Sequence, residues 1–120
     1  MNVLEIESTT TSPKVTLLPE GKVIFSGKSM MENAIDFYDD IHVWIDNYIA
    51  EGKDQLNLEF DFVYFNSTSA KQILKMLMLL DDSSLTCVVD WKHPEDHDIL
   101  KYRGAELESM LNMEFNYVPY

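Results

Sequence analysis

Cysteine and long apolar runs are what this chain of 120 residues lacks most plainly. Cys87 is its single cysteine, so no disulfide can form within the chain, and the apolar residues around it predict a buried, unreactive thiol. No stretch approaches the roughly 20 apolar residues of a membrane span, and the first residues show no basic-then-apolar signal pattern. We therefore expect a protein of the reducing cytoplasm, without membrane insertion.

Positive charge is also scarce. The chain has 9 Lys and Arg against 21 Asp and Glu, which gives a formal net charge of -12 at pH 7. Such a chain repels the phosphates of nucleic acids and of anionic membrane surfaces, so both classes of partner are excluded. A basic patch on another protein would be attracted, although an acidic surface also serves solubility alone.

Sequence signatures of catalysis are missing as well. The 4 glycines form neither a dinucleotide-binding fingerprint nor a phosphate-binding loop, and no serine lies in a nucleophile elbow. His93 and His97 are four residues apart, a spacing that can bind a metal on a helix, but Pro94 indicates that His93 is a helix cap. We expect a solvated helix start there, with no metal, no cofactor and no enzymatic activity. A small metal-dependent enzyme using these histidines is the alternative.

The residues that are present suit a single domain over 1–120, with 46% hydrophobic and 25% charged residues. Alternating apolar residues predict strands over 14–18, 22–26, 55–65, 85–91 and 113–117, with 4–7 as an additional first strand. In the longest, the apolar series from Leu56 to Tyr64 shares one face, and Asn57, Glu59 and Asp61 share the other. Two carboxylates on that face predict that it is exposed to water.

Three helices are predicted between these strands. Ser29 and Glu32 have the spacing of a capping box and predict a first helix that extends to about residue 50. Asn66 or Ser67 is the natural N-cap of a second helix, and Pro94 suits the first turn of a third, which runs to about residue 110. Alternating strands and helices predict an α/β domain with a mixed four- to five-stranded sheet and about three helices mainly on one face.

One segment carries a mechanism. Asn66-Ser67-Thr68-Ser69 places three hydroxyl groups at a helix N-terminus directly after a strand, where unpaired amides and the helix dipole favour a phosphate. These hydroxyls could equally be helix caps alone. If this end meets a partner, phosphorylation would add about -1.5 to -2 charge there and oppose association.

The helix that follows this segment supplies the other candidate binding residues. Lys71, Gln72 and Lys75 form its main polar side, and Lys71 is four residues after Ser67, where it can act as a counter-charge. Met76 and Met78 either pack in the core or belong to an adaptable partner surface. The predicted partner-binding residues are Asn66, Ser67, Thr68, Lys71, Lys75 and Met78.

The sequence resembles the SiaC-type regulatory phosphoproteins over nearly its whole length. The resemblance is carried by residues 64–71 with Leu74 and Leu77, by Gly27 through Glu32-Asn33-Ala34 to Phe37-Tyr38 with Trp44 and Tyr48, and by the segment from Ile6-Glu7 to Ser12-Pro13. It implies an architecture related to the STAS domains, the anti-sigma-factor antagonists. It also implies a partner-switching circuit with a protein kinase, a PP2C-type phosphatase and a diguanylate cyclase.

In such a circuit the unphosphorylated protein is expected to bind and activate the cyclase, which raises cyclic di-GMP, and phosphorylation prevents that complex. The acceptor in the family is usually a threonine directly after the asparagine, and here that position is Ser67, with Thr68 one place later. The resemblance therefore points to Ser67 first, Thr68 second and Ser69 third. A STAS-like antagonist that acts on an anti-sigma kinase is the alternative binding role.

Overall fold

The computed structural model describes all residues, 1–120, as alternating strands and helices. In chain order the elements are β1 Leu4–Ile6, β2 Lys14–Leu18, β3 Lys22–Ser29, α1 Ala34–Ala50, β4 Gln55–Phe65, α2 Ser67–Asp81, β5 Thr86–His93, α3 Ile99–Glu108 and β6 Phe115–Pro119. The predicted α/β class and the three helices are confirmed. None of these helices has the length and apolar character needed to cross a bilayer.

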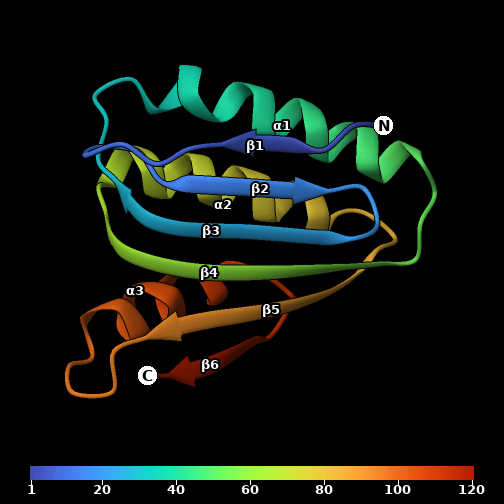
Figure 1. Cartoon of the computed structure of the whole chain (residues 1–120). Coiled ribbons are helices and arrows are strands. Elements are labelled where there is room, and N and C mark those ends of the chain that lie inside the picture. Colours follow the sequence, from blue (N-terminus) through green and yellow to red (C-terminus); the bar gives the residue numbers. More distant parts are fainter.

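The strands form one sheet in the order β1-β2-β3-β4-β5-β6, so each strand lies beside its neighbours in the chain. The first three are antiparallel, and β3 to β6 are parallel. Right-handed crossovers that all step in the same direction across a sheet place their helices on the same face. Figure 1 looks onto the other face, with all three helices behind the strands.

The sheet has six strands, so the prediction of four to five was too low. The additional strand is β1, which spans Leu4–Ile6 and matches the extra first strand that the alternation over residues 4–7 indicated. Pairing with β2 and a hydrogen bond from the Trp44 indole to the Asn2 carbonyl, 2.9 Å long, hold this edge in place. The contacts that order it come from residues far along the chain.

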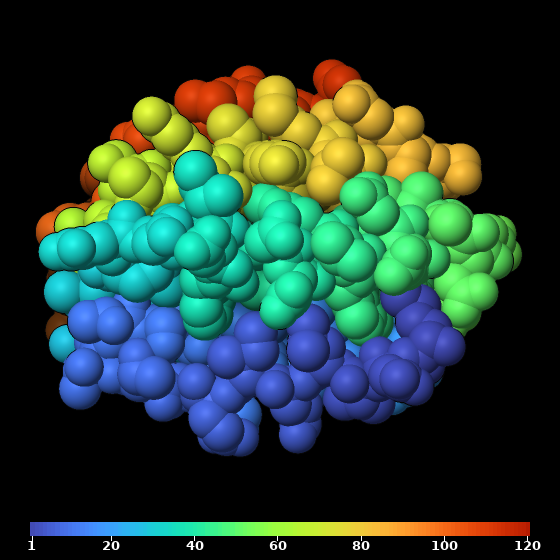
Figure 2. All heavy atoms as spheres, turned by 90° about the horizontal axis from the view of Figure 1, so that it is seen from above, coloured from blue at the N-terminus to red at the C-terminus, as the bar shows by residue number.

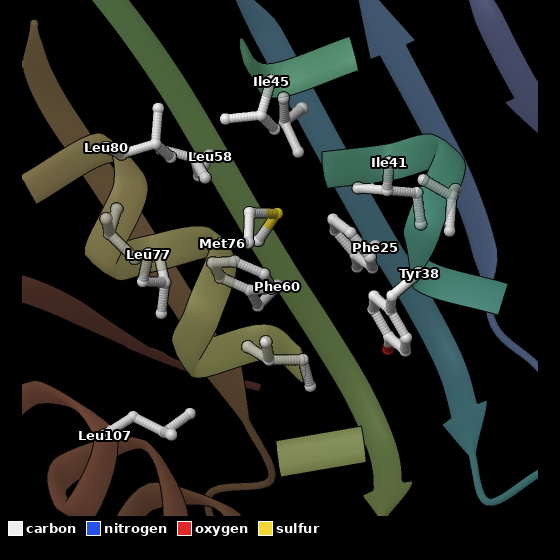
Figure 3. Packing of buried hydrophobic residues seen from close by; sticks show 14 of the residues in the cluster. Phe25, Tyr38, Ile41, Ile45, Leu58, Phe60, Met76, Leu77, Leu80 and Leu107 are labelled. Atoms are coloured by element: carbon white, nitrogen blue, oxygen red, sulfur yellow. The ribbon is translucent and has the colours of Figure 1, made fainter. Parts of the chain in front are cut away.

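The core lies between the sheet and the helices. Phe25 and Phe60 on neighbouring strands stack with ring centroids 5.4 Å apart, and Tyr38 of α1 lies against Phe25 at 6.2 Å. Figure 3 shows Ile41 and Ile45 of α1 and Met76, Leu77 and Leu80 of α2 around them. Met76 is fully buried whereas Met78 is 46% exposed, so of the two methionines only Met78 is available to a partner.

The face of the sheet without helices is polar, as predicted. Glu59 at its centre lies 3.9 Å from Lys22 Nζ and 3.6 Å from Lys92 Nζ, on the two strands that flank β4. Asn57 is exposed and Asp61 is partly exposed on the same face. Ion pairs with this much solvent contact contribute little to stability, so they mainly balance the charge on an open surface.

Tyr64 is the exception to the predicted alternation in β4. The register between β3 and β4 shifts after Gly27: Gly27 pairs with Phe62, and the next residue, Lys28, pairs with Tyr64. Val63 has no partner on β3 and forms a β-bulge. The shift turns Tyr64 to solvent, where it is 46% exposed, and turns Phe65 into the core. Because Phe65 directly precedes Asn66, the bulge also sets how the chain enters α2.

The capping box predicted at Ser29 was wrong. Ser29 is the buried last residue of β3, and α1 begins at Ala34 with Asn33 as its N-cap. The Asn33 side chain accepts a hydrogen bond from the Asp36 amide at 3.3 Å. Ser29 and Asn33 are both residue types that can cap a helix. Because residues 28 and 29 pair with β4 as part of a strand, the helix starts after Asn33 instead.

The third helix and the last strand both begin later than predicted. Pro94 lies in a loop, α3 spans Ile99–Glu108, and β6 spans Phe115–Pro119 rather than 113–117. The β5 strand extends to His93, where backbone bonds to Tyr120 continue the pairing with β6. That pairing holds the chain extended through His93 and delays the start of the helix.

Candidate functional site

The turn between β4 and α2 is organised by Asn66. Its side-chain oxygen accepts from the Ser69 amide at 2.9 Å and from the Thr68 hydroxyl at 3.1 Å, so Asn66, not Ser67, is the N-cap. Its side-chain nitrogen donates to the Met31 carbonyl at 3.3 Å, which ties the loop before α1 to this turn. One residue therefore caps α2 and holds the Thr68 hydroxyl in place.

Ser69 belongs to a buried cluster of polar groups. Its hydroxyl oxygen lies 2.8 Å from that of Ser29, which lies 2.8 Å from the Tyr38 hydroxyl, and the Ser69 hydroxyl also donates to the Met31 sulfur at 3.6 Å. Ser29, Tyr38 and Ser69 are fully buried, and burial raises the pKa of Tyr38. A kinase has no access to Ser69 in this fold, which removes it as a candidate acceptor.

Ser67 and Thr68 are both exposed at the first turn of α2. The Thr68 hydroxyl is engaged with Asn66, whereas no protein group bonds to the Ser67 hydroxyl. Both side chains lie at the positive end of the helix dipole, beside amides without a helical partner. The geometry thus leaves two accessible hydroxyls where a phosphate is electrostatically favoured.

The predicted partner-binding residues line up on one exposed stripe of α2. Thr68, Lys71, Lys75 and Met78 follow one another at spacings of three and four residues and are all exposed. Neither lysine lies within salt-bridge distance of a carboxylate, because the two ion pairs of the chain both involve Glu59. Figure 2 shows α2, in yellow-green to yellow, alongside α1 in teal, so the stripe is part of the helical surface.

A hollow of about 150 Å³ separates the start of α2 from α3. Its lining residues are Phe65, Ala70, Lys71, Leu74, Arg103, Glu106, Leu107 and Met110. The guanidinium carbon of Arg103 lies 4.3 Å above the centre of the Phe65 ring. The sequence interpretation missed Arg103, because only the tertiary structure brings α3 beside α2.

A second hollow of about 200 Å³ lies on the opposite side of the turn. Thr68, Lys71 and Gln72 line it from α2, and Glu32, Asn33, Ala34 and Ile35 line it from the start of α1. A carboxylate therefore faces the Thr68 side of the turn. Lys71 lines both hollows and is the cation common to them.

The histidines do not form a metal site. His93 is buried with Nδ1 3.1 Å from the Pro94 carbonyl oxygen, and His97 lies exposed in the following loop. No group of three or more His, Cys, Asp or Glu side chains is placed to hold a metal ion.

Cys87 is expected to react slowly with thiol reagents. Burial, with a smaller contribution from Asp81, raises the pKa of its thiol from 9.0 to about 11. Because the thiolate is the nucleophile, a rise of that size lowers its concentration at pH 8 about 100-fold. A thiolate of higher pKa is also intrinsically more nucleophilic, so Ellman's reagent should modify the native protein about tenfold more slowly than the urea-unfolded chain. Cys87 is only partly buried, so the predicted burial is confirmed in part, and equal rates in the two states would contradict the raised pKa of its thiol.

Known proteins resemble the chain in sequence and in fold. The model of the family described as "SiaC family regulatory phosphoprotein" matches residues 6–120. An uncharacterized protein of Pseudomonas aeruginosa strain UCBPP-PA14 is 26% identical over 84 residues, which are 69% of this chain and 67% of that protein.

Among solved structures, SiaC of Pseudomonas aeruginosa superposes with a TM-score of 0.92 over 100% of both chains at 20% identity. The SiaC activator in a crystal structure with the diguanylate cyclase SiaD, from the same organism, gives 0.92 at 20% identity over 98% of this chain and 99% of that one. At this identity the two structures establish a shared fold.

Proposed function

Because this chain belongs to the SiaC family of regulatory phosphoproteins, we propose that it is a non-enzymatic switch that binds and activates a diguanylate cyclase. In this proposal the unphosphorylated form binds the cyclase and raises cyclic di-GMP, which controls biofilm formation or aggregation. Phosphorylation of Ser67 or Thr68 abolishes the complex. A protein kinase adds the phosphate and a PP2C-type phosphatase removes it, all in the cytoplasm.

The observation that carries this proposal is the position of two exposed hydroxyls at one end of the α2 stripe. Ser67 and Thr68 are within one turn of Lys71, and Lys75 and Met78 continue the same face. An exposed methionine offers an adaptable apolar contact, and unpaired lysines offer charges for an acidic partner group. A partner seated on this stripe would cover the start of the helix, where the hydroxyls lie.

A phosphate at that position acts against such a partner through charge. It adds about -1.5 to -2 charge beside Lys71, which would otherwise be free to meet a carboxylate of the partner. Like charges placed opposite one another in an interface are repelled, and burial makes the repulsion stronger. Loss of only about 1.4 kcal/mol of binding free energy lowers the affinity tenfold.

A STAS-like antagonist of an anti-sigma kinase is the second candidate, and the same turn favours it. In that role the same exposed hydroxyls receive the phosphate, but the partner is the kinase that sequesters a sigma factor rather than a cyclase. The two roles differ in the protein that co-purifies with the unphosphorylated chain.

The protein isolated from its own cells provides the test. Mass spectrometry should place a phosphate on Ser67 or Thr68, and the dephosphorylated fraction should carry a diguanylate cyclase and increase its rate of cyclic di-GMP synthesis. The phosphorylated fraction should do neither. Absence of phosphate from both residues would remove the regulatory proposal, and an anti-sigma kinase in place of the cyclase would favour the second candidate.

A further inference from the structure

Arg103 is a cation without an anionic partner. Its side chain makes no hydrogen bond within the protein and no ion pair, since both ion pairs of the chain are on Glu59. Glu106, one turn later on α3, lines the same hollow but does not neutralise it within salt-bridge distance. The chain has a net charge of -12, so most cations could find a carboxylate nearby. An arginine that pairs with none, at the rim of a hollow, is therefore available to an anion from elsewhere.

Phe65 keeps the Arg103 guanidinium in place. The guanidinium carbon lies 4.3 Å above the ring centre, a cation–π contact that orients the group but uses none of its N–H donors. Phe65 itself is fully buried by the bulge that turns it inward. The fork of N–H groups is thus held on a rigid support with its donors free, the arrangement that favours two-point binding of a phosphate.

Lys71 supplies a second cation at the same hollow. Helical side chains tilt towards the N-terminus of their helix, so Lys71 on α2 and Arg103 on α3 both reach back towards the start of their helices. Both helices run back from the carboxyl ends of parallel strands, so these starts lie at the same end of the sheet. Ser67 shares a helix face with Ala70, Lys71 and Leu74, the α2 residues that line the hollow.

We propose that the hollow between α2 and α3 is an intramolecular binding site for the phosphate of Ser67, with Arg103 and Lys71 as its ligands. The inference rests on the proposed function, because it takes Ser67 as a phosphoacceptor. Arg103 donates two N–H groups to the phosphate oxygens while it remains on Phe65, and Lys71 pairs with the phosphate from one helical turn away. The bound phosphate closes the N-terminal end of the hollow.

Thr68 has no equivalent site. The hollow on its side of the turn contains Lys71 but also Glu32, and no arginine. The charged side chains that line the hollow on the Thr68 side are one lysine and one carboxylate, whereas two cations and one carboxylate, Glu106, line the hollow between α2 and α3. The electrostatic difference makes Ser67 the residue whose phosphate is stabilised within the protein.

This site changes what phosphorylation does. The two cations that would otherwise be available to a partner become neutralised by the protein's own phosphate, and the apolar lining of the hollow is covered. The switch then withdraws a binding surface as well as adding a repulsive charge.

The test uses the full chain with phosphoserine placed genetically at position 67, so that it depends on neither the natural kinase nor a partner. Phosphorus NMR over a pH range gives the second pKa of the phosphate, which is about 6 without protein contacts. Two bound cations should lower it by about one unit relative to a synthetic phosphopeptide of residues 62–72. The comparison with the peptide needs no substitution in the protein.

Substitutions then assign the ligands. Arg103→Gln should return the pKa towards the peptide value and Arg103→Lys should restore part of the shift, whereas Lys101→Gln, an exposed cation of α3 outside the hollow, should leave it unchanged. Equal pKa values in protein and peptide, or equal effects of Arg103→Gln and Lys101→Gln, would overturn the site. If the pKa is lowered but the phosphorylated chain still binds the cyclase, the site stands and the proposed function fails.

Discussion

Ser67→Asp is expected to weaken cyclase binding by at least about tenfold, or about 1.4 kcal/mol. Aspartate carries one negative charge where the phosphate carries nearly two, so it reproduces only part of the effect. An acidic residue in the first turn of a helix stabilises that helix, so the loss of binding cannot be ascribed to unfolding. Titration calorimetry with the purified cyclase measures the change.

Two neutral variants serve as controls for this prediction. Ser67→Asn matches the shape of aspartate without its charge, and Ser67→Ala removes the acceptor and should leave the partner bound in the presence of the kinase. If asparagine and aspartate weaken binding equally, the effect is steric and the electrostatic explanation is wrong. If the pattern appears for Thr68→Asp and not for Ser67→Asp, Thr68 is the functional acceptor.

Trp91→Ala is expected to lower the free energy of unfolding by about 4 kcal/mol. The Trp91 indole is buried among aromatic rings, with Phe60 at 5.4 Å, Phe65 at 5.9 Å and Phe115 at 5.8 Å, and it donates a 2.8 Å hydrogen bond to the Leu100 carbonyl. A domain of this size is stable by about 5–15 kcal/mol, so the loss is a large fraction of the total. Urea denaturation followed through the remaining tryptophan, Trp44, measures it.

Gly104 allows α3 to pack directly against the Trp91 ring. A Cβ atom at Gly104 would lie 2.6 Å from the Trp91 ring, so α3 can approach β5 closely only because this residue is glycine. Val118→Ala, on the partly exposed last strand beside β5, is the matched control and should change stability by less than about 0.5 kcal/mol. A loss below about 1 kcal/mol for Trp91→Ala would show that α3 is not held by this contact.

The sequence correctly predicted the helices and strands that are determined by residues close together in the chain. The start of α2 is one, because Asn66 caps the helix through atoms within three residues of itself. The long strand over 55–65 is another, since its alternation is strict up to Phe62. The polar face of the sheet followed from the carboxylates on that strand alone.

The predictions that were wrong depend on contacts between distant residues. Ser29 has the sequence of a cap but is drawn into β3 by pairing with β4 and into a buried cluster by Ser69. Tyr64 leaves the core because of a bulge, and Pro94 lies in a loop rather than in a helix because β5 continues alongside β6 up to His93. The residues that make these contacts are too far apart in the sequence for a local pattern to reveal them.

The candidate site divides in the same way. Ser67, Thr68, Lys71, Lys75 and Met78 belong to one helix, so helical spacing alone placed them on one surface. Arg103 reaches the site across the groove between two helices, and the burial of Ser69 depends on Ser29 and Tyr38. Tertiary packing therefore buries one of the three predicted phosphoacceptors, Ser69, and brings one further cation, Arg103, to the candidate site.

Each strand of the sheet pairs with the strand made just before it, so every newly synthesised strand finds its neighbour already in place. The antiparallel pairings of β1, β2 and β3 close short loops at little cost in chain entropy, whereas each parallel pairing from β3 to β6 must close a loop that contains a whole helix. The sheet can grow outward from the first hairpin during translation, with one helix added at each later step. Each open strand edge waits only for the next strand in the chain, and the number of edges exposed at one time stays small while the chain is being made.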